Sequence, residues 1–110
     1  MKQYTVDELR PQDYEKIKDY LNENLSGGGI DGVYWIPIDS DLLSREQAAH
    51  TDCHPLYFMA DLEPDQLSCE LLVRTQNKIR CTCMGYATET QRNWVIRYID
   101  GIFDTLNIAA

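Results

Sequence analysis

Residues 67–85 read LSCELLVRTQNKIRCTCMG, and this stretch decides the fold class. Apolar and polar side chains alternate through Leu67–Arg74 and again through Lys78–Gly85, which is typical of strands that bury one face. A three-residue loop between the two segments pairs Arg74 with Lys78, Val73 with Ile79, Leu71 with Cys81 and Cys69 with Cys83. This register places both apolar sets on the same face, as burial requires. The sequence therefore predicts an antiparallel hairpin with an odd-length loop.

Two further strands are expected upstream of this hairpin. Leu56–Leu62 is largely apolar and ends at residues 63–66, EPDQ, where proline and aspartate favour a tight turn. Val33–Ile38 is rich in β-branched and aromatic residues, and Pro37 favours an edge position because proline cannot donate to a ladder. The three later strands are predicted to form a meander, because their loops are too short for crossovers. The pattern leaves open whether Val33–Ile38 pairs with Leu56–Leu62 or lies at the far edge of the sheet.

Three helices accompany these strands. Pro11–Leu25 repeats apolar residues at spacings of three and four and ends just before three glycines. Leu42–His50 follows residues 39–41, DSD, which suit the N-cap of a helix. The last helix begins at Thr88, where Thr88 and Gln91 match a capping box, and it reaches about Leu106.

The predicted order is α-β-α-β-β-β-α. Amphipathic helices and a sheet with one apolar face bury their apolar surfaces by packing as two layers. We therefore expect an α+β two-layer sandwich with a mainly antiparallel sheet, on which the N- and C-terminal helices pack. A chain of 110 residues has room for one such domain, spanning 1–110.

Composition and charge exclude several classes of function. The chain carries a net charge of −8, and residues 1–65 alone hold 14 acidic and 5 basic side chains, a net −9. Such a chain repels phosphate backbones, so no nucleic-acid partner is expected. No apolar run approaches the roughly 18 residues of a membrane span, and no export signal follows Met1. We therefore expect a cytoplasmic protein that does not associate with a membrane.

A glycine motif in residues 27–32 does not predict a nucleotide cofactor. Gly27, Gly29 and Gly32 match G-x-G-x-x-G, but the dinucleotide fingerprint lies after a strand and before a helix. Here the glycines follow a helix, whose C-terminal end carries a partial negative charge that repels anions. The motif is interpreted as a loop between a helix and a strand.

Histidine and cysteine residues offer a zinc site as an alternative function. His50, Cys53 and His54 lie within five residues, and Cys81 or Cys83 from the hairpin would complete four ligands. Residues two apart on a strand have Cα atoms about 6.6 Å apart, whereas two thiolates on one zinc need sulfur atoms near ~3.8 Å. Because the familiar C-x-x-C spacing is also missing, no metal and no other cofactor is expected.

Thiol chemistry is a second alternative. Cys69 and Cys83 face each other in the predicted hairpin, close enough for a disulfide, but a reducing cytoplasm keeps such a pair as free thiols. Cys53 is adjacent to His54, yet neighbouring residues rarely aim at one point, and inward cysteines of a hairpin are unreactive. Carboxylates are plentiful at Asp39, Asp41, Glu46 and Asp52. No catalytic set emerges, so an enzyme is not favoured.

The aromatic segment of the first predicted strand suggests a binding surface. Alternation sends Trp35 to one face of the strand and Tyr34 and Ile36 to the other. One of those faces is a candidate partner site, unless helices cover both. The leading hypothesis is a non-enzymatic binding or regulatory domain that associates with a protein partner or with itself, through this aromatic strand or through a helix face.

Overall fold

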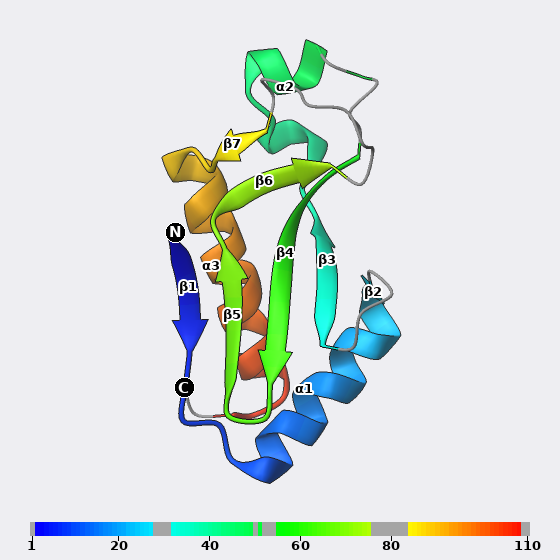
Figure 1. Ribbon diagram of the computed structural model, residues 1–110, viewed down its shortest axis with the longest axis vertical. Coiled ribbons are helices and arrows are strands. Elements are labelled where there is room, and N and C mark those ends of the chain that lie inside the picture. Colours follow the sequence, from blue (N-terminus) through cyan, green and yellow to red (C-terminus); the bar gives the residue numbers. More distant parts are fainter. Residues whose placement is uncertain (1, 28–31, 50, 52–54, 76–83, 109–110) are drawn as a thin grey trace.

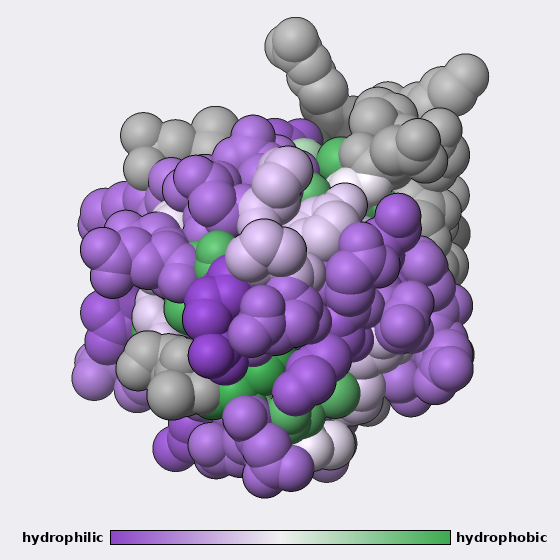
Figure 2. Space-filling view, turned by 90° about the horizontal axis from the view of Figure 1, so that it is seen from below, coloured by the Kyte–Doolittle hydropathy of each residue, from purple (hydrophilic) through white to green (hydrophobic). Residues whose placement is uncertain are grey.

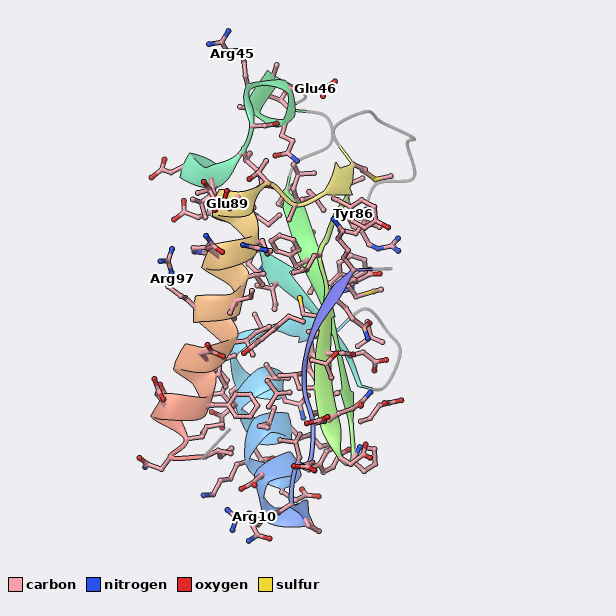
Figure 3. The ribbon with its side chains drawn as sticks, turned by 90° about the vertical axis from the view of Figure 1, so that its left-hand side faces the viewer. Arg10, Arg45, Glu46, Tyr86, Glu89 and Arg97 are labelled. Carbon is pink, nitrogen blue, oxygen red and sulfur yellow. The ribbon has the colours of Figure 1, made fainter. Side chains whose placement is uncertain are left out.

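A computed structural model describes residues 2–27, 32–49, 51, 55–75 and 84–108 (Figure 1). Its strands form one antiparallel sheet, and helices α1 and α3 lie on one face of that sheet (Figure 3). The predicted α+β class is therefore confirmed. No helix among the residues described is long and apolar enough to cross a membrane.

The elements follow one another along the chain in an order that differs slightly from the prediction. They are β1 (Gln3–Val6), α1 (Pro11–Asn24), β2 (Ser26–Gly27), β3 (Val33–Pro37), the 3-10 helix η1 (Ser40–Leu42), α2 (Arg45–Ala49), β4 (Leu56–Glu63), β5 (Gln66–Glu70), β6 (Leu72–Thr75), β7 (Gly85–Tyr86) and α3 (Glu89–Thr105). The main differences are the additional N-terminal strand β1, the short strand β2 and the division of two predicted elements.

Both long helices begin where capping chemistry predicts. Pro11 is the first residue of α1, and the Asp13 carboxylate accepts hydrogen bonds from the backbone N–H of Arg10 at 3.4 Å and from its Nε at 3.0 Å. At α3, the Thr88 hydroxyl accepts from Gln91 N at 3.2 Å, while Gln91 Oε1 accepts from Thr88 N at 3.0 Å. The predicted capping box and the predicted extents of both helices are confirmed.

The middle helix is shorter than predicted and is divided in two. Leu43 has extended backbone angles, with ψ 141°, so η1 ends before it and α2 begins only at Arg45. Ser44 then opens a second capping box, in which Ser44 N donates to Gln47 Oε1 at 2.9 Å and Gln47 N donates to Ser44 Oγ at 3.2 Å. The prediction of one helix over 42–50 was wrong because this local capping restarts the helix. His50 lies outside the described residues.

The sheet places β4 at its centre and answers the question about the first predicted strand. β3 pairs antiparallel with β4, from Val33 opposite Asp61 to Pro37 opposite Tyr57. β2 pairs with β3 only at positions 34 and 35, so the predicted edge position applies to the Pro37 end of β3 and is wrong for the strand as a whole.

The hairpin register differs from the prediction. The strand expected over 67–74 is broken at Leu71, whose N–H donates to Lys2 O at 3.0 Å and whose carbonyl accepts from Ala87 N at 2.9 Å. Val73 then pairs with Gly85 rather than with the predicted Ile79. Odd-numbered residues pair with odd-numbered residues, as predicted. The partner of Val73, however, lies six residues further along the chain than predicted. Residues 76–83 lie outside the described part of the chain.

The predicted pairing of Cys69 with Cys83 is also wrong. Cys69 lies on β5 between two strand neighbours, opposite Tyr4 of β1 on one side and Ala60 of β4 on the other. The predicted meander holds for β4 and β5, and β6 continues along β4 beyond the break, with Leu56 opposite Thr75, and also pairs with β7. The physical reason is that β1 takes the side of β5 that the hairpin was expected to occupy.

The core lies between the sheet and the two long helices. Ile17 and Leu21 of α1, Val95 and Ile99 of α3 and Phe58 of β4 are all at most 1% exposed. Alternation along the strands therefore sends one set of side chains into this core and the other set to the helix-free face of the sheet. Seen from the end where β1 finishes and α1 begins, the surface is mostly hydrophilic, with small hydrophobic patches between hydrophilic side chains (Figure 2).

Candidate functional site: the open edge of strand β1

The aromatic segment that the sequence singled out is divided between the two faces of the sheet. Tyr34 and Ile36 are buried under the helices, while Trp35 is half-buried on the helix-free face. The Trp35 ring makes an edge-to-face contact with Tyr57, with centroids 5.5 Å apart and planes at 73°. Its Nε1–H is buried and has no hydrogen-bond partner among the residues that the structure describes. The helices therefore cover only one of the two faces, and Trp35 offers its partners little accessible polar surface.

The thiol of Cys69 is a core group. Its side chain is fully buried, and it forms no disulfide. Burial in apolar surroundings, with a smaller contribution from the charge of Glu70, raises the pKa of the Cys69 thiol to about 12. This residue therefore holds a proton at neutral pH and is unsuited to nucleophilic catalysis.

The residues of the predicted zinc site belong to other segments of the chain. His50, Cys53, His54, Cys81 and Cys83 all lie outside the described residues, so the zinc alternative stays a prediction. Within the described ranges, no group of three or more His, Cys, Asp or Glu side chains is arranged to hold a metal ion.

The glycine motif is described only in part. Gly27 lies in β2, and Gly32 precedes β3 with φ +85°, a conformation that favours glycine. The Gly32 carbonyl accepts from Leu62 N at 2.7 Å, which ties the start of β3 to β4. Gly32 therefore has a structural reason to be glycine, while Gly29 lies outside the described residues.

Strand β1 was not among the predicted elements, and one of its sides faces no described strand. β1 lies at the end of the strand order β1-β5-β4-β3-β2, at one side of the sheet in Figure 1, and among the described strands it pairs only with β5. Lys2 O accepts from Leu71 N on the β5 side. Backbone groups of successive residues point to opposite sides of a strand, so the N–H and C=O groups of Gln3 and Thr5 point to the open side.

Two hollows lie along β1, one at each end of the strand. The Lys2 hollow, of about 790 Å³, is lined by Lys2, Gln3, Leu71, Tyr86, Ala87, Glu89 and Arg92. The Asp7 hollow, of about 680 Å³, is lined by Tyr4, Thr5, Val6, Asp7, Glu8, Asp100, Phe103, Asp104 and Ile108. Each hollow combines residues of β1 with residues of α3 or of the segments that flank this helix. Figure 3 shows β1 in front with α3 to one side, and Tyr86 beside the beginning of β1.

A hydrogen bond between β1 and α3 joins the two walls of the Asp7 hollow. The Tyr4 hydroxyl donates to Asp100 Oδ1 at 2.5 Å. This bond, together with partial burial and the charge of Asp100, raises the pKa of Tyr4 to about 12. Tyr4 is therefore a fixed hydrogen-bond donor at neutral pH, and the raised pKa is opposite to what a tyrosine base or nucleophile requires.

The charge along β1 changes sign from one hollow to the other. Lys2 and Arg92 outnumber Glu89 in the Lys2 hollow, where Lys2 Nζ lies 5.8 Å from the centre of the Tyr86 ring. Among its described lining residues, the Asp7 hollow has four carboxylates and no basic side chain, together with the apolar residues Val6, Phe103 and Ile108. The open edge is therefore an electrostatically polarised groove rather than a uniform surface.

The alternation in residues 3–6, QYTV, was the signal that would have identified β1. Gln3 and Thr5 are exposed, while Tyr4 and Val6 are half-buried against the core. Four residues are a short run for a period-two argument, so a strand here is difficult to recognise from sequence.

Comparisons with known proteins add nothing to this geometry: no family model, no curated protein and no solved structure matches the chain.

Proposed function

We propose that this protein is a non-enzymatic binding domain that takes up an extended segment of a partner protein as an additional strand along β1. The observation that carries the proposal is the open side of β1, where the N–H and C=O groups of Gln3 and Thr5 face no described residue. Addition of a peptide strand to such an edge is a common mode of recognition, in which main-chain hydrogen bonds supply affinity.

The two hollows supply specificity in this mode of binding. Side chains of an added strand alternate, so every second one points toward α3, where the hollows lie. The strand from Gln3 to Asp7 advances by four residues, or about 13 Å. Two side chains of the partner that are four residues apart therefore match the spacing of the Lys2 hollow and the Asp7 hollow.

The chemistry of the described residues supports binding rather than catalysis. The Cys69 thiol has a raised pKa inside the core. The hydroxyl–carboxylate pair of Tyr4 and Asp100 is held with the proton on Tyr4. The pKa of the Tyr4 hydroxyl and that of the Cys69 thiol are both raised, which is opposite to the lowered pKa of an activated nucleophile.

The β1 edge is a better partner site than the aromatic strand. The polar atom of Trp35 is buried, and its ring already packs against Tyr57. The backbone groups of Gln3 and Thr5, by contrast, belong to exposed residues and are directed away from β5. A partner reaches them without rearranging the sheet.

A substitution at Thr5 tests the proposal. Peptides are selected from a random phage-displayed nonapeptide library, and their affinities are compared for the wild type, Thr5→Pro and Thr5→Ala. Proline removes an N–H on the open side, so it leaves the β1–β5 ladder intact but blocks an added strand. We expect at least a tenfold loss of affinity in Thr5→Pro, no more than a twofold change in Thr5→Ala, and unfolding free energies within about 1 kcal/mol of wild type.

Trp35→Glu separates the two candidate surfaces. This variant lowers the stability, because a charge replaces a half-buried ring, but its folded fraction still binds the selected peptides. Peptides that bind equally well to Thr5→Pro, or that lose binding only in Trp35→Glu, would place the site elsewhere. Failure to select any peptide would equally contradict the proposal.

A further inference from the structure

We infer that the segment bound along β1 carries a lysine or arginine whose side chain occupies the Asp7 hollow. The inference rests on the proposed function and adds to it the chemistry of the partner. Asp7, Glu8 and Asp104 are exposed and make no ion pair with any residue of the described ranges, and Asp100 accepts only the Tyr4 hydroxyl there. The hollow therefore presents four negative charges with no compensating cation from the described part of the chain.

The shape of the hollow matches a long basic side chain. Among its lining residues, the apolar Phe103 and Ile108 are buried and Val6 is half-buried, whereas the acidic Asp7, Glu8 and Asp104 are exposed. Lysine and arginine bury their methylene groups along apolar surface and keep the charged head among polar groups. A small metal ion fits less well, because the acidic groups of the described residues are not arranged as a ligand set.

The other end of β1 decides which end of the partner segment carries the base. In the Lys2 hollow, Lys2 and Arg92 face a single acid, Glu89, and Lys2 already lies over the Tyr86 ring. A basic side chain is repelled there and attracted about 13 Å away, at the Asp7 hollow. We therefore expect the partner segment to be basic at the end that lies at the Asp7 hollow and neutral or acidic at the other end.

A second copy of this chain is a poorer occupant of the edge than a basic segment of another protein. Each copy carries a net charge of −8, and its acidic groups outnumber its basic groups by 18 to 10. Electrostatic repulsion between two such molecules opposes their association. The negative potential of one molecule attracts a basic segment and accelerates its binding.

Three synthetic peptides test the inference. They have the sequence Thr-Val-Thr-X-Thr-Val-Thr with blocked ends, where X is lysine, glutamine or glutamate, and the sequence reads the same in both chain directions. Their affinities are measured by NMR titration of the 15N-labelled protein at low salt and in 1 M NaCl. We expect the lysine peptide to bind three- to tenfold more tightly than the glutamine peptide, and the glutamate peptide to bind more weakly than either. The difference disappears in 1 M NaCl.

Matched variants locate the effect. Asp7→Asn combined with Asp104→Asn removes two charges from the hollow without touching the Tyr4–Asp100 hydrogen bond. Glu15→Gln combined with Asp19→Asn removes two exposed charges from α1 and serves as the control for net charge. The preference for lysine is lost in the first variant and kept in the second.

Failure of the inference is distinguishable from failure of the proposed function. If the three peptides bind equally and all lose affinity in Thr5→Pro, the edge binds strands but the charge argument is wrong. If none of them binds, the proposed function itself fails. If sedimentation shows that the free protein is a dimer that Thr5→Pro dissociates, the occupant is a second copy and the inference is overturned.

Discussion

A buried glutamine at the start of α3 ties this helix to the segment between β3 and β4, and replacing it should destabilise the whole domain. Gln91 is fully buried, and its Nε2 donates to Leu42 O at 2.9 Å and to Gln47 Oε1 at 2.7 Å. Its Oε1 also accepts from Thr88 N in the capping box. One side chain therefore satisfies three polar groups on three segments.

The cost of Gln91→Met follows from these contacts. Methionine has a similar length but no polar partner to offer, so the variant loses three hydrogen bonds, each contributing about 1 kcal/mol. The Leu42 carbonyl and the Thr88 N–H are left without that partner, while Gln47 Oε1 still accepts from Ser44 N. Burial of the apolar methionine side chain offsets about 1 kcal/mol of the loss. The net destabilisation is about 2 kcal/mol.

Urea denaturation followed by circular dichroism measures this loss. A slope of about 1–2 kcal/mol/M converts it to a midpoint that is lower by about 1–2 M. Arg97→Met is the matched control, because Arg97 is exposed on the same helix and points away from the sheet (Figure 3), and it should change stability by less than about 0.5 kcal/mol. Equal midpoints for the two variants would refute the hydrogen-bond argument.

Three further outcomes are expected. Tyr4→Phe lowers stability below pH 10, and the difference from wild type shrinks between pH 10 and 12, because the raised pKa of Tyr4 stabilises the protein only while its hydroxyl is protonated; stability curves at several pH values measure this. Gly32→Ala lowers the free energy of unfolding by about 1–3 kcal/mol, because φ is +85° and the added Cβ lies 2.7 Å from a backbone oxygen of β4. Gly101→Ala, in open space within α3, raises it by up to about 1 kcal/mol, and thermal unfolding compares the two variants. Cys69 reacts with iodoacetamide only after unfolding, and fast native labelling at this residue in peptide mass spectra would contradict its burial.

Local patterns predicted the elements whose formation depends on nearby residues. The capping box at Thr88 and the proline at position 11 placed both long helices, because caps satisfy backbone groups within one turn. The apolar run of Leu56–Leu62 and the turn sequence after it likewise placed β4, since both signals are local. These features needed no knowledge of the rest of the chain.

Long-range pairing was predicted less well. The predicted hairpin assumed that Leu71 continues a strand, but its backbone bonds to Lys2 and Ala87, which lie far from it in sequence. Because β1 occupies one side of β5, the partner of Val73 moves from Ile79 to Gly85. A competing strand changes a register without leaving any trace in the local alternation.

The candidate site could not be predicted for the same reason. Asp7 and Asp104 belong to segments almost one hundred residues apart, and only the packing of β1 beside α3 brings them into one hollow. Each acid alone is an ordinary surface residue of an acidic chain. Cysteines, glycines and aromatic residues form recognisable sequence motifs, whereas the β1 edge consists of backbone groups and common charged side chains, which form none.

The composition of β1 argues that its edge is left open rather than protected. Exposed edges invite unwanted pairing, and proteins usually block them with proline, with inward-pointing charges or with a covering element. Residues 3–6, QYTV, contain no proline and no charge, and no described element pairs with their outer side. The charges stand instead at the two ends, with Lys2 before the strand and Asp7 after it. Such an arrangement leaves the main-chain groups free to bind a strand but selects which strand binds, because a segment of the wrong polarity places like charges together at both ends.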